Sequence, residues 1–203
     1  MKISCCLLVV AVALLAGCSS VHVHVDPEWK EAPQSITVLV TEPFIQNEAD
    51  LSDDFKTLDA FKEWFVSYLE ESFASYSKAA PSVRLVLDER LLVESVMLGK
   101  DSVKVPVPKF DELENLSGTV VTVPPVRFWR DHVPCPAGGS CIGGKNLNAL
   151  AFYSVTSAED RRKLAFGYAR GKDSFTFAMT KGNWEGVVKD FVKMLLEETP
   201  LKK

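Results

Sequence analysis

Residues 149–169, ALAFYSVTSAEDRRKLAFGYA, decide the fold of this 203-residue chain. Two apolar runs, residues 149–155 and 164–169, flank a charged turn over residues 157–163, which is the pattern of a β-hairpin. A helix is predicted to begin near Asn183 and to end before Pro200, with one apolar stripe formed by Trp184, Val187, Val188, Phe191 and Leu195. A sheet covered by this helix is therefore the first expectation.

The chain before the hairpin supplies more strands and a second helix. Apolar or β-branched runs predict strands over residues 36–40, 83–87, 119–123, 126–129 and 174–179. Residues 91–98 are ambiguous between strand and helix, and residues 103–108 alternate valine with lysine and proline, so they can pair only at a sheet edge. Seven apolar residues at spacings of three or four predict a helix from Asp53 to Tyr76, capped by Ser52 and including Phe65.

This element order predicts an α/β (α+β) domain over residues 35–199. Its single sheet is expected to be mixed or mostly antiparallel, with the two amphipathic helices packed on one face. The composition, with 47% hydrophobic and 25% charged residues, is typical of globular domains. A net charge of −4 excludes a dominant nucleic-acid surface. Residues 139–146 nearly spell a phosphate-binding loop, but Asn146 stands where Ser or Thr would bind Mg²⁺, so no nucleotide partner is expected.

The N-terminus has the pattern of an export signal. Lys2 precedes an apolar segment over residues 3–17, which is too short for a spanning helix and suits a signal-peptide core. It ends in Leu15-Ala16-Gly17-Cys18, which resembles the lipobox of bacterial lipoproteins. The resemblance implies cleavage before Cys18, a diacylglycerol on its sulfur and an acyl chain such as palmitate on the new amine. Ser19 in place of Asp implies the outer membrane, on its periplasmic side. The alternative is an ordinary secretory signal with a chance cysteine.

Residues 18–34 are expected to form a lipidated tether, since they are polar and contain Pro27 and Pro33. His22 and His24 alternate in this segment and would lie on one side of an extended chain, near Asp26. Two histidines without a third ligand fixed by the fold are a weak metal signal, so no metal or other cofactor is expected.

The body, residues 35–199, resembles small envelope lipoproteins whose domain is similar to the amino-terminal domain of the Tol-system propeller protein. The resemblance rests on element order and on the hairpin from Phe152 to Tyr168 before a terminal helix. It implies a non-enzymatic accessory in envelope assembly, cell-wall synthesis or transport.

Cys135 and Cys141 are the cysteines that remain after removal of the signal and acylation of Cys18. In an oxidising compartment two such cysteines normally form a disulfide. Two free thiols remain open, as does a reactive Cys141 with His132 as base and Asp131 as its orienter.

Together these observations predict a lipid-anchored protein that is not an enzyme and binds another envelope component. The contact is expected in the Gly- and Pro-rich loop predicted from Asp131 to Asn148, at His132, Ile142 and Lys145. The alternatives are an envelope hydrolase that uses Cys141 and His132, and a carrier of lipid or glycan between sheet and helices. The cationic hairpin tip, Arg161-Arg162-Lys163, is either simply solvent-exposed or touches acidic headgroups or glycan.

Overall fold

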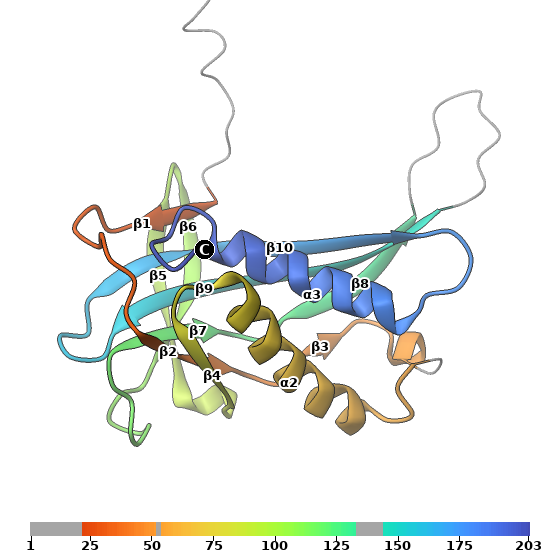
Figure 1. The fold of residues 1–203 in the computed structure, drawn as a ribbon, viewed down its shortest axis with the longest axis horizontal. Coiled ribbons are helices and arrows are strands. Elements are labelled where there is room, and N and C mark those ends of the chain that lie inside the picture. The colour runs from red at the N-terminus through yellow and green to blue at the C-terminus, as the bar shows by residue number, and fades with distance from the viewer. Residues whose placement is uncertain (1–21, 52–53, 133–143) are drawn as a thin grey trace, which may run out of the picture.

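The computed structural model describes residues 22–51, 54–132 and 144–203, which form a mixed sheet and two α-helices (Figure 1). The large sheet has the order β1-β10-β9-β7-β2-β4, and β8 joins it by pairing with β9 and with β3. Its strands are β1 (Val23–Val25), β2 (Ser35–Val40), β3 (Phe44–Ile45), β4 (Ala80–Leu85), β7 (Thr119–Val123), β8 (Arg127–His132), β9 (Lys145–Ser157) and β10 (Lys163–Phe175). This confirms the α+β class and the mixed sheet.

The hairpin of β9 and β10 forms the centre of the fold, as its sequence predicts. Its register pairs Tyr168 with Phe152 and continues to Phe175 opposite Lys145. The separate strand expected over residues 174–179 is wrong, because β10 continues without a break to Phe175. The loop expected from Asp131 to Asn148 is shorter at both ends, since residues 131–132 belong to β8 and residues 145–148 to β9.

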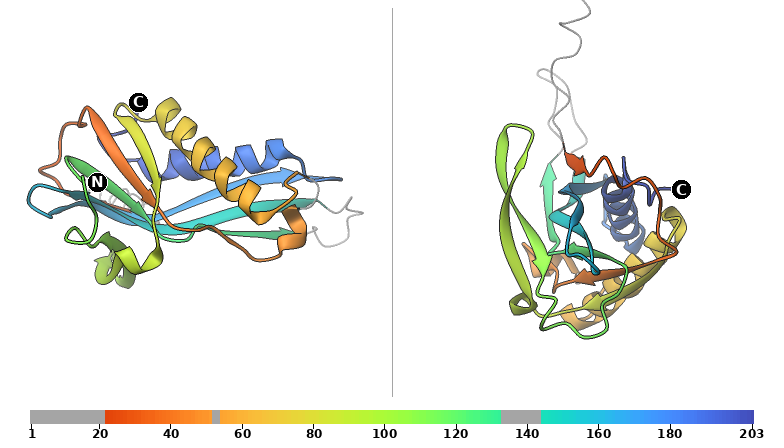
Figure 2. Two further views of the ribbon diagram at one scale, coloured as in Figure 1. Left: turned by 90° about the horizontal axis from the view of Figure 1, so that it is seen from below. Right: turned by 90° about the vertical axis from the view of Figure 1, so that its left-hand side faces the viewer.

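The parallel strands β2, β4 and β7 come from the first half of the chain, and β2 lies between the other two. All five residues of β7 are buried, so both of its faces are covered. β5 (Leu91–Leu98) and β6 (Asp101–Pro108) form a separate two-stranded sheet, which confirms that residues 103–108 lack a central place. This hairpin lies on the side of the large sheet away from the helices (Figure 2), where the Ser154 hydroxyl donates to the Pro106 carbonyl.

The first helix, α2 (Leu58–Tyr76), begins five residues later than predicted. Thr57 is its N-cap, and the Thr57 hydroxyl accepts a hydrogen bond from the Ala60 amide at 3.1 Å. Ser52, the cap expected from the sequence, lies outside the described residues. A 3₁₀ turn, η1 (Glu48–Leu51), precedes this region, and a second, η2 (Asp88–Arg90), leads into β5.

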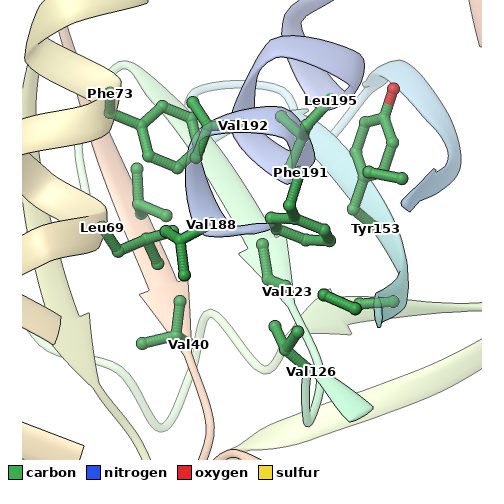
Figure 3. Close-up of a cluster of buried hydrophobic side chains, with 14 of the residues drawn as sticks. Val40, Leu69, Phe73, Val123, Val126, Tyr153, Val188, Phe191, Val192 and Leu195 are labelled. Atoms are coloured by element: carbon green, nitrogen blue, oxygen red, sulfur yellow. The ribbon is translucent and has the colours of Figure 1, made fainter. Parts of the chain in front are cut away.

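The second helix, α3 (Lys181–Leu196), packs on β10 and β9 and against α2. Each apolar residue predicted for its stripe is buried. The Phe191 ring lies over Val123 of β7, and Leu195 lies beside Tyr153 of β9 (Figure 3). The aromatic stripe of α2 is core as well, because Phe61 and Phe65 pack against Phe128 of β8 at centroid distances of 5.7 Å.

Close approach of α3 to the sheet depends on Gly171 in β10. A Cβ atom there would lie 1.9 Å from the Val187 carbonyl oxygen and 2.9 Å from the Phe191 nitrogen, both on the backbone of α3. The helix therefore rests directly on the strand at this point, and a side chain at Gly171 would force the two apart.

Part of the segment expected to be a tether, residues 18–34, is packed onto the domain. Residues 23–25 form β1, which pairs antiparallel with residues 165–167 of β10, and Trp29 is buried. Gly167 makes the pairing possible, because a Cβ there would lie 2.2 Å from the His22 carbonyl oxygen. Among the residues described, no helix combines the length and apolar character needed to cross a bilayer.

Candidate functional site

The candidate site lies where β8 ends and β9 begins, at the two strand residues nearest in sequence to the segment that carries the two cysteines. His132 is the last residue of β8 and Lys145 the first of β9, and the two are register partners across the ladder. The fold thus brings together two of the three residues predicted to contact a partner. Ile142, Cys135 and Cys141 lie outside the described residues, so the disulfide stays a prediction.

A pocket of about 220 Å³ opens beside this pair. Every residue that lines it is polar or charged, and the residues come from the segment before η1, from η1 itself and from the two strands: Gln46, Asn47, Asp50, Arg130, Asp131, His132 and Lys145. Such a surface offers hydrogen-bond donors and acceptors of both charges, and it suits a polar partner group rather than an apolar one.

Two of the residues that line this pocket, Asp50 and Arg130, form an ion pair. The Asp50 side chain is only 5% exposed, and it also accepts a hydrogen bond from the Asn47 amide at 2.9 Å. Loss of either charged partner from a buried pair leaves a charge uncompensated, which typically costs several kcal/mol. The pair therefore fixes η1 against β8.

Asn146 supports the strand end from the other side. Its amide donates to Asp131 at 2.8 Å, and its carbonyl oxygen accepts from the Ser174 hydroxyl at 2.8 Å. Asp131 is thus engaged by Asn146, and successive side chains of a strand point to opposite faces. The structure gives Asp131 a partner other than His132. It therefore offers no support for the hydrolase alternative, in which Asp131 would orient the His132 ring.

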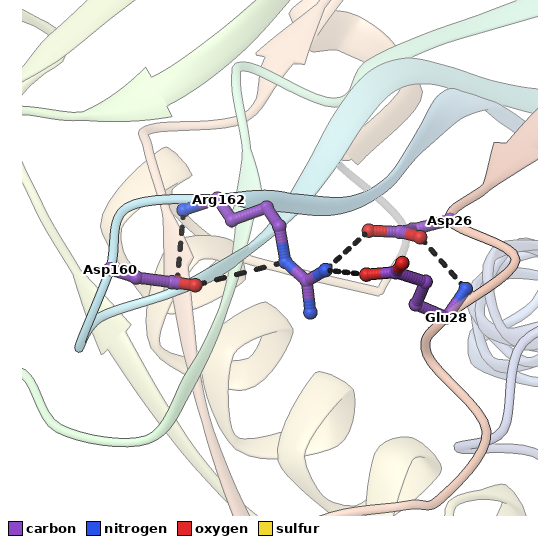
Figure 4. A network of polar contacts seen from close by, with 4 residues as sticks. All are labelled: Asp26, Glu28, Asp160 and Arg162. Atoms are coloured by element: carbon purple, nitrogen blue, oxygen red, sulfur yellow. Dashed lines mark hydrogen bonds and ion pairs between the residues drawn. The ribbon is translucent and has the colours of Figure 1, made fainter.

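The hairpin tip differs from the simple exposed tip that the sequence suggests. The Arg162 guanidinium lies 3.2 Å from Asp26 and 2.8 Å from Glu28, and the backbone amide of Arg162 donates to the Asp160 carboxylate (Figure 4). Hydrogen bonds from Ser157 and from the Arg162 amide lower the pKa of Asp160. Arg161 pairs with Asp111 at 2.6 Å, and Lys163 pairs with Glu94. With its cations neutralised, the tip is a poor surface for acidic headgroups.

Sequence reasoning missed Asp50, Arg130 and Asn146. The pattern gave no signal for the ion pair, since eighty residues separate its members. The alternation Asn146-Leu147-Asn148 is a usable signal of a strand, although the expected loop covers these residues, and all three are buried in β9. In the described part of the chain no three histidine, cysteine or acidic side chains gather as a metal site.

The fold and site define a class: an α+β domain with a helix-covered mixed sheet and a polar pocket at one sheet end. No protein-family model matches the chain, and no curated protein matches it. Among solved structures, the PelC dodecamer from Paraburkholderia phytofirmans is 10% identical, with a TM-score of 0.42, over 89% of this chain and 98% of that one. Uncharacterized lipoprotein B from Nitrosomonas europaea is 10% identical, with a TM-score of 0.39, over 86% of this chain and 88% of that one. Likeness at this level transfers no function.

Proposed function

We propose that this protein is a lipid-anchored, non-enzymatic component of a bacterial envelope. It binds another envelope component at the place where β8 ends and β9 begins. The observation that carries the proposal is the register pair of His132 and Lys145 beside the polar pocket. Binding residues on a segment held by a rigid scaffold lose less conformational entropy when a partner docks. Here the Asp50–Arg130 pair and the Asn146 hydrogen bonds provide that rigidity.

The position of β1 supports the same arrangement. β1 meets β10 at Gly167, and Lys145 lies opposite Phe175 of the same strand. Eight residues of extended strand span roughly 27 Å. An acylated Cys18 just before β1 would therefore hold the domain at one place, while the partner-binding end stands well away from it.

The carrier alternative requires a cavity between sheet and helices. The core between α2, α3 and β8 gives it no support, because fully buried aromatic side chains pack against one another there, among them Phe61, Phe65, Phe128 and Trp184. The proposed partner is therefore a macromolecule bound at the surface, and nucleotides and nucleic acids are not proposed.

Site-specific crosslinking in cells tests the proposal. A photo-reactive amino acid at His132 or Lys145 should give a crosslinked partner, while the same group at exposed Lys104 of β6 should give none. The double variant Cys135→Ser, Cys141→Ser should keep its fold and anchoring but lose the crosslink, because a seven-residue disulfide loop removes roughly 2 kcal/mol of unfolded-state entropy and fixes the contact residues. Unchanged crosslinking with faster proteolytic nicking would show that the bridge only protects the loop.

A thiol count separates this proposal from the hydrolase alternative. Alkylation of the exported protein under denaturing conditions should modify neither Cys135 nor Cys141 before reduction and both after it. Modification of Cys141 without reduction, combined with hydrolysis lost in Cys141→Ser, would favour the hydrolase.

A further inference from the structure

Five cationic side chains gather where the end of α3, β10 and the C-terminal segment meet. Arg170 and Lys172 come from β10, Lys193 from α3, and Lys202 and Lys203 from the segment after it, and all five are exposed. They line a groove of about 520 Å³. We call these five residues the basic surface.

The charge of this surface opposes that of the whole chain. Only two acidic side chains, Asp190 and Glu197, line the same groove, although acidic residues outnumber basic ones over the chain by 27 to 23. Arg170, Lys172 and Lys202 have no carboxylate within 4 Å anywhere in the described residues. Lys193 lies 3.6 Å from Asp190, and Lys203 donates to the Ala74 carbonyl at 2.6 Å. Three of the five cations therefore have no carboxylate partner in the described part of the chain, unlike the three cations of the hairpin tip, which are all paired.

The surface also has an apolar component. Tyr76, Met194 and Leu196 line the groove among the cations. The Lys193 ammonium lies 5.2 Å from the Tyr76 ring centre, and the Arg170 guanidinium lies 5.1 Å from that of Tyr168. Aromatic rings beside cationic groups suit the boundary of a bilayer, where one side of a residue meets acyl chain and the other meets phosphate.

The start of the described chain lies directly beside this surface. The His22 carbonyl accepts a hydrogen bond from the Tyr168 amide at 2.9 Å, and His22 Nε2 lies 3.6 Å from Glu197 of the groove. Cys18 precedes His22 by four residues, and four residues span at most about 14 Å. A lipid on Cys18 would therefore keep His22, which lies at the edge of the basic surface, within about 14 Å of the membrane.

We infer that the basic surface faces the membrane that carries the anchor and binds the phosphates of acidic phospholipids. This inference rests on the lipid anchor of the proposed function. Each Lys or Arg near an anionic bilayer strengthens binding about fivefold. Acylation holds the domain to the membrane, and the basic surface would then determine which side of the domain faces the lipid.

Lysine footprinting of the acylated full chain in vesicles tests the inference. A water-soluble acetylating reagent is applied to protein in phosphatidylcholine vesicles and in vesicles with 30% phosphatidylglycerol. Labelling of Lys172, Lys193 and Lys202 should be at least fivefold slower in the anionic vesicles. Lys56 and Lys181 are matched controls, since both are exposed and Lys181 lies about 18 Å from Lys193 along the same helix. Their labelling should change less than twofold.

A charge-reversal pair links the protection to these cations. In Lys172→Glu, Lys193→Glu the protection of Lys202 should fall below twofold, whereas Lys56→Glu, Lys181→Glu should keep it. Equal labelling in the two vesicle types, on a chain whose mass includes acyl groups, overturns the membrane-facing surface and leaves the anchor intact. A chain without acyl mass overturns both. Equal slowing of the three lysines by inorganic phosphate in neutral vesicles would identify a site for a free anion and also overturn the inference.

Discussion

The close contact between α3 and β10 should make Gly171→Ala strongly destabilising. The new Cβ would lie 1.9 Å from the Val187 carbonyl oxygen, about 1.5 Å short of ordinary contact at 3.4 Å. The atoms that the new Cβ would meet, the Val187 carbonyl oxygen and the Phe191 nitrogen, belong to the backbone of α3 and cannot rotate away. The helix must therefore move away from β10, and its buried side chains lose part of their dispersion contacts. Overpacking of this kind costs about 3 kcal/mol or more. For a domain of this size, that lowers Tm by about 6–12 °C.

Two other glycines of α3 provide controls for this prediction. In Gly182→Ala the nearest atom is the Thr180 hydroxyl at 3.5 Å, so the helix should gain up to about 1 kcal/mol. In Gly186→Ala the contact is with the Asp173 carboxylate, a side chain that can rotate away, so the cost should be smaller than at Gly171. Thermal unfolding followed by circular dichroism measures all three. A Gly171→Ala protein that melts within about 2 °C of wild type would refute the close-contact reasoning.

Three further outcomes are expected. Cys18→Ala should abolish lipid labelling and leave unprocessed precursor, whereas continued acylation and a mature form would contradict the lipobox interpretation. Phe65→Ala and Phe191→Ala should each cost about 3–5 kcal/mol, since both rings are fully enclosed, and urea unfolding checks this. Burial raises the pKa of Tyr153 above its ordinary value of 10, with smaller contributions from Glu198 and Glu197. The proton is held more tightly in the folded state, so stability should fall as pH rises above 10, and Tyr153→Phe should reduce that slope in pH-dependent urea titrations.

The central hairpin and the stripe of α3 were predictable because their signals are local and repeat over many residues. The apolar run over residues 149–155, bounded by a charged turn, predicts a strand, and the spacing of Trp184, Val187 and Phe191 predicts a helix. The start of α2 was not predictable in the same way. Ser52 and Thr57 are both competent caps, and the choice depends on tertiary packing that the local sequence does not contain.

The candidate site was only half accessible to sequence reasoning. His132 and Lys145 were found because they flank an unusual loop, and their register pairing follows from the hairpin-like return of the chain. Asp50 and Arg130 were not found, since an ion pair between a 3₁₀ turn and a distant strand depends on how η1 lies against β8. β1 was missed for a similar reason, because a three-residue strand has too little pattern to reveal its partner.

The pairing of β1 with β10 has a consequence for the order in which the protein matures. Val23 is among the first described residues to be synthesised, yet its partner Gly167 follows about 140 residues later. Closure of so long a loop is entropically costly, and three residues of ladder offer little in return. β1 therefore stays unpaired until β10 has been synthesised. By the same balance, β1 should join the sheet late and be among the first strands to leave it in local unfolding.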